Sequence, residues 1–334
     1  MKRAPGLVSA LVAVCTIAAA GPGAPGLIYG IHDWNPGADG IFHGKRGWTV
    51  ESVNTANYPF DFQPSEAQQA SEKFGLIIRI NKQAGQTVPT NSAEFDAFAT
   101  AAAGKVNQFK QWCNTWIIGN EMNASFEGAV PYASYVDVYR RCKQQIEAVQ
   151  PDAIVLVGAV APWNSTQNPG GPYAHAWLNY MHQLVTALGA EADGYAIHAY
   201  GGRSGDSDPR DDNYWGFGVF KDWMTVIDSN SMARNAGVYL TEFNHAADGD
   251  SNGDGWPNVA YPAGFIQKAY EAINTWNETH AHRISCACWF AYDNGGFPGY
   301  DLTLLSTARS DFEYVTQNTH YIGVAAARDW ELFE

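Results

Sequence analysis

Two glutamates stand at the ends of strongly apolar segments. Glu121 follows the segment 116–120 (WIIGN), and Glu242 follows the segment 238–241 (VYLT). A carboxylate without a compensating partner is costly beside such apolar runs. Either glutamate alone is explained as a residue at the edge of the core that pairs with an arginine or a histidine. Together they predict two carboxyl groups that flank a bond to be cleaved, one of them donating a proton.

The elements that must position these glutamates are eight short apolar runs that alternate with helical patterns. The runs mostly lack polar alternation, which is typical of strands buried on both faces of a parallel sheet. The predicted strands cover residues 27–32, 48–53, 76–81, 116–121, 154–160, 195–200, 238–243 and 285–292. The predicted helices cover residues 64–73, 92–110, 132–149, 173–188, 217–229 and 261–279. This alternation predicts an α/β fold, namely a single-domain (β/α)8 TIM barrel. A doubly wound open sheet is the alternative, but no glycine-rich phosphate loop follows the first run.

Polar or aromatic residues end nearly every one of these runs. In a (β/α)8 barrel the carboxyl ends of all strands meet at one rim, where active sites lie. We therefore expect these side chains to converge on one site for a small molecule or a sugar. The candidates at the strand ends are His32 and Trp34, Arg79, Asn120 and Glu121, Trp163, His198 and Tyr200, Glu242, and Trp289.

Four short motifs follow one another along the chain: IIGNEMN (117–123), IHAYG (197–201), VYLTEFN (238–244) and CWFAYD (288–293). In this order they resemble clan A of the glycoside hydrolases, which includes the family 5 cellulases and mannanases. The resemblance covers residues 27–310 in layout and points to no single family within the clan. Clan members are (β/α)8 barrels with an Asn-Glu acid/base after the fourth strand and a glutamate nucleophile after the seventh. The strand count made from the residues places Glu121 and Glu242 at these positions.

The resemblance implies hydrolysis of a β-linked glycan with retention of configuration. Glu121 is then the acid/base, which must carry a proton when the bond breaks, and Glu242 is the nucleophile, which must be ionised. Arg79 is expected to supply the positive charge beside Glu242, with a structural salt bridge of the barrel as the alternative. Asn120 is expected to bind the sugar 2-hydroxyl, unless it caps the backbone.

His198 and Tyr200 are two residues apart on one run and therefore share its barrel-facing side. Tyr200 is expected to donate to Glu242, with satisfied polar groups of the core as the alternative for both residues. The resemblance places a stacking platform for the sugar at Trp289, and a core tryptophan is the alternative.

Several tryptophans fall in expected loops, where they either contact sugar faces or hold a loop in place. They are Trp34, Trp163, Trp215 and Trp256. The first run and the segment after it match no signature of a particular family. His32 and Asp33, with Lys45 or Arg46, are candidates for reading an acidic sugar, although the overall charge disfavours anionic polymers.

Composition and the N-terminus bound the class of protein. The chain has 334 residues, of which 46% are hydrophobic, 13% aromatic and 16% charged, with a net charge of −14. Few charges and many aromatics exclude a disordered chain, and the negative balance argues against a nucleic-acid partner. Residues 1–20 have the pattern of a secretory signal peptide, followed by a flexible lead over 21–26 and the catalytic domain over 27–334. We expect a secreted or periplasmic monomer with no membrane attachment after cleavage, and cleavage would change the net charge to −16 because it removes two cations.

Cysteines and an acidic loop are the remaining features with possible chemistry. Cys113 and Cys142 can form a disulfide in an oxidising compartment, whereas Cys286 and Cys288 share one face of a strand and are expected to pack as small apolar groups. The loop with Asp248, Asp250, Asn252 and Asp254 resembles the first half of a calcium-binding EF-hand loop. Its twelfth position is Val259, where that loop needs a glutamate, so a solvated turn is the favoured reading. No cofactor is expected to be required.

Two rival functions use the same residues. One is a carbohydrate-binding barrel without catalysis, and the other is a transglycosidase that transfers the sugar to an acceptor other than water. An esterase is disfavoured because the chain has no Gly-x-Ser-x-Gly motif. In every case the expected partner is a poly- or oligosaccharide.

Overall fold

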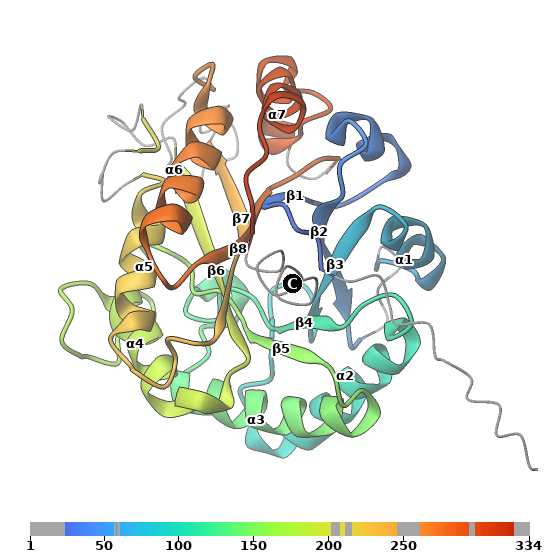
Figure 1. Cartoon of the computed structure of the whole chain (residues 1–334). Coiled ribbons are helices and arrows are strands. Elements are labelled where there is room, and N and C mark those ends of the chain that lie inside the picture. Colours follow the sequence, from blue (N-terminus) through green and yellow to red (C-terminus); the bar gives the residue numbers. More distant parts are fainter. Residues whose placement is uncertain are drawn as a thin grey trace, which may run out of the picture.

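The computed structural model describes residues 24–56, 58, 61–201, 208–210, 216–245, 261–293 and 298–323. Eight parallel strands form a closed barrel in which each strand pairs with the next along the chain and β8 pairs with β1. The helices surround this barrel (Figure 1). The predicted (β/α)8 architecture is confirmed. The strands are β1 (Tyr29–His32), β2 (Gly47–Asn54), β3 (Phe74–Asn81), β4 (Thr115–Ile118), β5 (Ile154–Val157), β6 (Gly194–Gly201), β7 (Gly237–His245) and β8 (Ile284–Trp289).

Seven α-helices occur among the described residues. They are α1 (Pro64–Ser71), α2 (Phe95–Phe109), α3 (Tyr132–Val149), α4 (Ala176–Leu188), α5 (Val219–Asp228), α6 (Phe265–Thr279) and α7 (Ser306–Asn318). A 3-10 helix, η1 (Pro36–Phe42), takes the place of a helix between β1 and β2. The sequence analysis missed α7 because this segment is mostly polar. Its buried residues, which include Ala308, Phe312 and Val315, nevertheless follow the spacing of one helix face. Within the described part of the chain, none of the helices has the length and apolarity needed to span a membrane.

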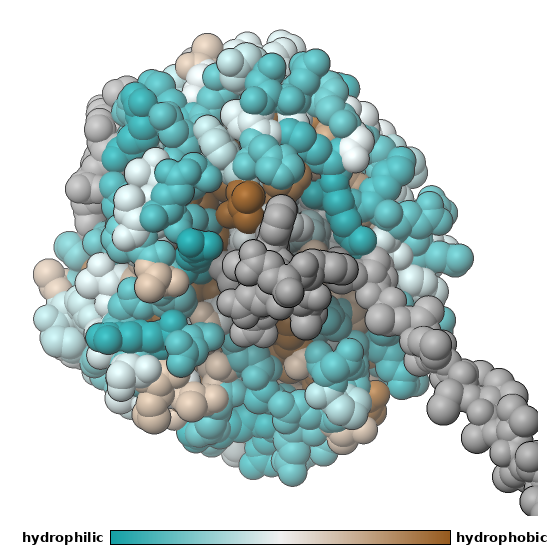
Figure 2. All heavy atoms as spheres, viewed as in Figure 1, coloured by the Kyte–Doolittle hydropathy of each residue, from teal (hydrophilic) through white to brown (hydrophobic). Residues whose placement is uncertain are grey.

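Two apolar layers hold the barrel together. Side chains on the inner face of the strands fill the barrel, among them Trp48, Ile77 and Ile117. Alternate residues of the same strands point outward and pack under the helices. These outward residues and the helices form the larger of the two apolar clusters. The barrel below the site is therefore a packed core, and the polar side chains of the candidate site enter it at the carboxyl ends of the strands. The face of the molecule seen in Figure 1 is largely hydrophilic, with apolar residues visible in small separate areas (Figure 2).

Lys45 and Arg46 do not lie where the sequence analysis expected them. Lys45 donates to the carbonyl of Thr319, and Arg46 donates to the carbonyl of Phe74 at 3.4 Å. Both cations directly precede β2, so they lie at the amino end of the barrel, opposite the rim formed by the carboxyl ends of the strands. Their predicted role in reading an acidic sugar is therefore wrong.

The four described cysteines are buried and free. Cys113 and Cys142 form no disulfide. The Sγ atoms of Cys286 and Cys288 lie 3.9 Å apart inside the barrel, where both side chains pack as predicted. The signal peptide, the possible calcium loop with Asp248, Asp250, Asn252 and Asp254, and the side chains of Trp215 and Trp256 lie outside the described residues.

Candidate active site

The chain after β4 turns so that two successive polar side chains face the barrel axis. The predicted strand ran to residue 121, but β4 ends at Ile118, and Gly119 and Glu121 adopt positive φ values of 74° and 43°. A Cβ at Gly119 would lie 2.9 Å from Val88 Cγ1, so only glycine fits this turn without a shift. Strict alternation would turn either Asn120 or Glu121 away from the axis. The left-handed turn brings both of them inward.

A bulge in β7 sets the direction of Glu242. Ile197 of β6 pairs with Leu240, but the next residue of β6, His198, pairs with Glu242, so Thr241 is the extra residue. Tyr239 points into the barrel. Without the bulge, alternation from Tyr239 would send Glu242 outward under the helices. β-Bulges beside active sites commonly redirect a side chain in this way.

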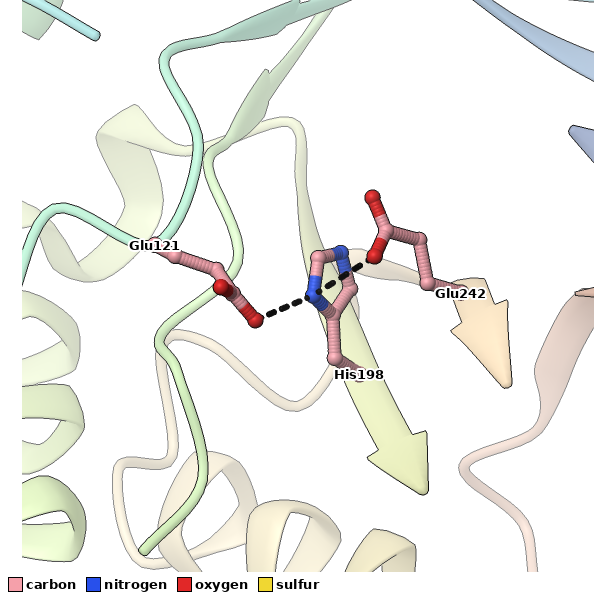
Figure 3. Close-up of side chains that lie close together, drawn as sticks. All are labelled: Glu121, His198 and Glu242. Atoms are coloured by element: carbon pink, nitrogen blue, oxygen red, sulfur yellow. Dashed lines mark hydrogen bonds and ion pairs between the residues drawn. The ribbon is translucent and has the colours of Figure 1, made fainter. Parts of the chain in front are cut away.

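The two glutamates lie close together with a histidine between them (Figure 3). His198 Nδ1 lies 2.9 Å from Glu121 Oε1 and 3.4 Å from Glu242 Oε2. One carboxylate oxygen of Glu121, one of Glu242 and one ring nitrogen of His198 all lie within 4.8 Å of one another. This short separation belongs to the class in which one carboxylate attacks the sugar directly, since catalysis through an interposed water needs about 6.5–9.5 Å.

Glu242 is buried and surrounded by donors. Arg79 Nη1 donates to Oε1 at 2.5 Å, and the hydroxyl of Tyr200 donates to Oε2. Burial by itself raises the pKa of Glu242, but the charges of His198, Arg79 and His32 and the Tyr200 hydrogen bond outweigh it and lower the pKa to about 2. Glu242 is therefore ionised throughout the ordinary pH range. Burial, together with Glu242 and Glu121, raises the pKa of Tyr200, so this hydroxyl keeps its proton and remains a donor.

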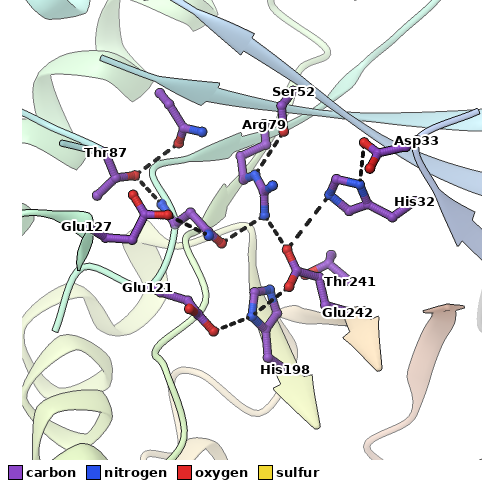
Figure 4. A network of polar contacts seen from close by, with 12 residues as sticks. His32, Asp33, Ser52, Arg79, Thr87, Glu121, Glu127, His198, Thr241 and Glu242 are labelled. Atoms are coloured by element: carbon purple, nitrogen blue, oxygen red, sulfur yellow. Dashed lines mark hydrogen bonds and ion pairs between the residues drawn. The ribbon is translucent and has the colours of Figure 1, made fainter. Parts of the chain in front are cut away.

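Arg79 connects the nucleophile candidate to the residue before Glu121. Its Nη1 also donates to Asn120 Oδ1 at 2.9 Å, and its Nε donates to Ser52 Oγ at 3.1 Å (Figure 4). Burial lowers the pKa of Arg79, but the charge and hydrogen bond of Glu242, together with the charges of Glu127 and Asp33, outweigh it and raise the pKa. Arg79 therefore places a positive charge beside Glu242 and also forms a salt bridge inside the barrel, because its partner in that salt bridge is Glu242 itself.

His32 ends β1 with one ring nitrogen occupied and one unused. Its Nδ1 lies 2.8 Å from Asp33 Oδ1, while Nε2 lies 3.8 Å from Glu242 Oε1 and has no hydrogen-bond partner among the described residues. The residue is only 2% exposed. A buried polar atom without a partner costs about 1–3 kcal/mol. A ligand hydroxyl at this nitrogen would remove that cost.

Trp289 does not line the site around Glu121 and Glu242. Its side chain is 0% exposed, and its Nε1 donates to the carbonyl of Tyr300 at 3.1 Å. It lies on the outer face of β8 and packs edge-on against Phe243 and Tyr261, so the core alternative is correct. Phe290, one residue later, is half-buried, and its ring centre lies 5.0 Å from that of His32. The sequence analysis missed Phe290 because it named the tryptophan next to it.

Trp34 and Trp163 lie in the loops after β1 and β5, where both are half-buried against the outer core. The main-chain N–H of Trp34 donates to Glu51 Oε1 at 2.8 Å, which fixes the start of that loop. The indole Nε1 of Trp34 donates to Asp39 Oδ1 at 3.4 Å, within the segment that follows β1. Another residue that sequence reasoning missed is Glu127, whose Oε1 accepts from Asn120 Nδ2 at 3.3 Å. The one signal in the sequence for this contact is that Glu127 follows Glu121 by six residues, in the same connection after β4.

The same three residues are the candidates for a metal site among the described residues, because Glu121, His198 and Glu242 offer atoms at suitable spacing. Their ligand atoms are already engaged: Glu121 with His198, and Glu242 with Arg79 and Tyr200. A guanidinium bonded directly to one ligand opposes a divalent cation electrostatically. The arrangement suits proton transfer and nucleophilic attack better than metal binding.

No protein-family model and no curated protein matches the sequence. Similar solved structures are found at low sequence identity. One is a glucosidase from Croceicoccus marinus, 13% identical with a TM-score of 0.57, over 90% of this chain and 69% of that chain. Another is an endo-β-1,3-glucanase of glycoside hydrolase family 128, subgroup I, from Amycolatopsis mediterranei, in complex with laminaripentaose. It is 17% identical with a TM-score of 0.55, over 86% of this chain and 99% of that chain.

A third similar structure is a family 39 glycoside hydrolase from the gut symbiont Bacteroides cellulosilyticus WH2. It is 14% identical with a TM-score of 0.55, over 83% of this chain and 59% of that chain, so this chain spans less than two thirds of that enzyme. These structural neighbours are glycoside hydrolases. At such low identity the likeness shows a shared fold, and the chemistry has to be argued from the site itself.

Proposed function

We propose that this protein is a secreted retaining glycoside hydrolase that cleaves the O-glycosidic bonds of a β-linked poly- or oligosaccharide. The observation that carries the proposal is the pair Glu121 and Glu242, whose nearest oxygens lie within 4.8 Å at the carboxyl ends of β4 and β7. A double displacement through a covalent intermediate requires such a short separation.

In the first step the Glu242 carboxylate attacks the anomeric carbon while Glu121 gives its proton to the leaving oxygen. Arg79 and Tyr200 hold Glu242 in one orientation and keep it ionised. Orientation of this kind reduces the barrier because the attacking atom needs no reorganisation. The C1–O bond to the leaving group breaks, and a bond from C1 to a Glu242 oxygen forms.

In the second step Glu121, now a carboxylate, removes a proton from water, and the water oxygen displaces Glu242 from C1. His198 Nδ1 lies 2.9 Å from Glu121 Oε1, and a proton on this nitrogen would donate to the ionised carboxylate and stabilise it. Two displacements at the same carbon restore its configuration. A sugar acceptor in place of water would give transglycosylation with the same residues.

The unused Nε2 of His32 and the half-buried ring of Phe290 support a neutral sugar next to Glu242. The imidazole can exchange a hydrogen bond with a hydroxyl, and an aromatic ring can lie against a sugar face. The similar family 128 structure is a β-1,3-glucanase in complex with laminaripentaose. β-1,3-Glucan is therefore the first glycan to test, followed by other β-linked glucans, mannans and xylans.

The test compares the mature protein with three variants on this glycan panel. Both substitutions keep the side-chain shape: Glu242→Gln removes the attacking carboxylate, and Glu121→Gln removes the group that donates and later accepts a proton. Glu191→Gln is the control, because Glu191 is exposed, pairs with Arg140 and lies just before β6 at the opposite end of the barrel. We expect cleavage by the wild type and the control and a loss of at least about 1000-fold in the other two. Sugar binding without cleavage by the wild type would instead identify a non-catalytic barrel.

A further inference from the structure

A third carboxyl group, that of Glu127, is connected to the nucleophile candidate through a chain of hydrogen bonds. Glu127 ends η3 (Ser125–Glu127), a 3-10 helix in the connection between β4 and α3. Its Oε1 accepts from Asn120 Nδ2 at 3.3 Å, Asn120 Oδ1 accepts from Arg79 Nη1 at 2.9 Å, and the same Nη1 donates to Glu242 (Figure 4). The chain of contacts passes directly beside Glu121.

The amide of Asn120 is held at both ends by groups of opposite character. Arg79 can only donate, so it selects the amide oxygen, and an ionised carboxylate can only accept, so Glu127 selects the amide nitrogen. The amide is planar and turns as one unit about its Cβ–Cγ bond, so two contacts hold it in one orientation more firmly than one contact does. Glu127 and Arg79 together therefore hold the direction of the second N–H of Asn120 Nδ2.

The backbone keeps these two residues at a fixed distance from each other. Thr87, which is fully buried, accepts from the main-chain N–H of Asn120 through its Oγ1 and donates from its own main-chain N–H to the Glu127 carbonyl at 3.2 Å. Its hydroxyl also donates to Asn81 Oδ1 at 2.9 Å. Gly128 then ends η3 with a φ of 100°, a left-handed conformation that favours glycine. The position of Glu127 is built into the loop by these contacts.

The charged groups that face Glu127 come from three strands. They are Arg79 from β3, Glu121 after β4, and Glu242 from β7. Burial raises the pKa of Glu127 to about 7, with Glu121 and Glu242 adding to this effect and Arg79 and Asn120 opposing it. The carboxyl thus changes its charge near neutral pH, and with it the strength of its hold on Asn120.

We propose that Glu127 is a positioning residue that orients the Asn120 amide toward the reacting sugar and makes this orientation dependent on its own ionisation. The kinetic part of this inference rests on the proposed function. Glu127 itself needs no contact with the substrate. The ionised form holds Asn120 Nδ2 in place, and the protonated form holds it less firmly because a neutral acceptor binds an N–H more weakly.

Kinetics of two substitutions separate positioning from a merely structural role. Glu127→Leu removes the acceptor, and we expect kcat to fall by about 10- to 100-fold with little change in KM. Glu127→Gln keeps an acceptor oxygen without a titratable proton, so we expect kcat within about threefold of wild type and no inflection of the pH profile near 7. Glu147→Leu on the exposed face of α3 is the control for removing a carboxylate. Wild-type kcat in Glu127→Leu would overturn the proposal.

A spectroscopic test needs no substrate and so survives a failure of the proposed function. In protein labelled with 15N-asparagine, the side-chain NH2 signal of Asn120 is assigned by its loss in Asn120→Asp. We expect this signal to titrate with a midpoint near 7 in the wild type and to stay constant in Glu127→Gln. Equal behaviour of the signal in both proteins would overturn the inference. Failure of the wild type to cleave any glycan would overturn only the proposed function.

Discussion

Replacement of Tyr200 by phenylalanine removes one oxygen from the surroundings of Glu242 and leaves the ring in place. That oxygen donates to Glu242 Oε2, while Arg79 and His32 face the other carboxylate oxygen. The half-buried ring of Tyr200 stands edge-on to His198, with the ring centres 6.2 Å apart, and phenylalanine preserves this contact. The change therefore isolates one hydrogen bond to the nucleophile.

The size of the effect follows from the strength of a hydrogen bond to a charged group, about 1.5–3 kcal/mol. One pKa unit corresponds to about 1.4 kcal/mol, so losing the bond raises the pKa of Glu242 by roughly 1–2 units. The wild-type value of about 2 then becomes roughly 3–4. Since attack needs ionised Glu242, activity is lost as the pH falls through this pKa, and the acid limb moves upward in the variant.

The assay measures kcat/KM from about pH 2 to 8 on the best substrate of the glycan panel, because this ratio reports ionisations of the free enzyme. Circular dichroism at each pH confirms that the protein is folded. Tyr139→Phe is the matched control, since this buried hydroxyl donates to the Val155 carbonyl at 2.7 Å, away from the glutamates. An upward shift smaller than about half a unit in Tyr200→Phe, or an equal shift in Tyr139→Phe, would refute the reasoning.

Three further outcomes are expected. Trp289→Ala should lower the free energy of unfolding, measured in urea, by about 3–5 kcal/mol, because it empties a fully buried site. Phe290→Ala should mainly raise KM. A raised KM with unchanged stability in Trp289→Ala would instead show that Trp289 contacts the sugar. Alkylation of the protein unfolded without reductant should modify Cys113 and Cys142, which are free, and an unmodified pair in the mass spectrum would reveal a disulfide. Treatment with a chelator should leave kcat/KM unchanged, because Glu121, His198 and Glu242 already contact one another or protein donors. A loss of activity that a divalent cation restores would contradict this.

The barrel was predictable from the sequence because apolar runs and helical patterns alternate over most of the chain. Most of the polar residues at the carboxyl ends of these runs converge, because the strands of a closed parallel barrel end at one rim. The tryptophans do not, since Trp289 points outward and Trp34 and Trp163 pack against the outer core. Strand ends were less predictable. β4 ends three residues earlier than expected, because Gly119 leaves the strand conformation in a turn that no periodicity reveals.

Side-chain direction was the part that sequence periodicity could not supply. The bulge at Thr241 reverses the alternation of β7, and without it Glu242 would face the helices. At Trp289 the expectation failed for a related reason, since this residue points outward and its neighbour Phe290 lies beside His32. Glu127 was missed because it reaches the site from a 3-10 helix in a loop, far from any strand end.

The stereochemistry of the first product tests the central claim most directly. The separation of no more than 4.8 Å between the carboxylate oxygens of Glu121 and Glu242 leaves no room for a water that attacks the sugar directly. Proton NMR of the anomeric signals, recorded before mutarotation, should therefore show the β-anomer as the first product from a β-linked glycan. The α-anomer as the first product would contradict a double displacement at Glu242.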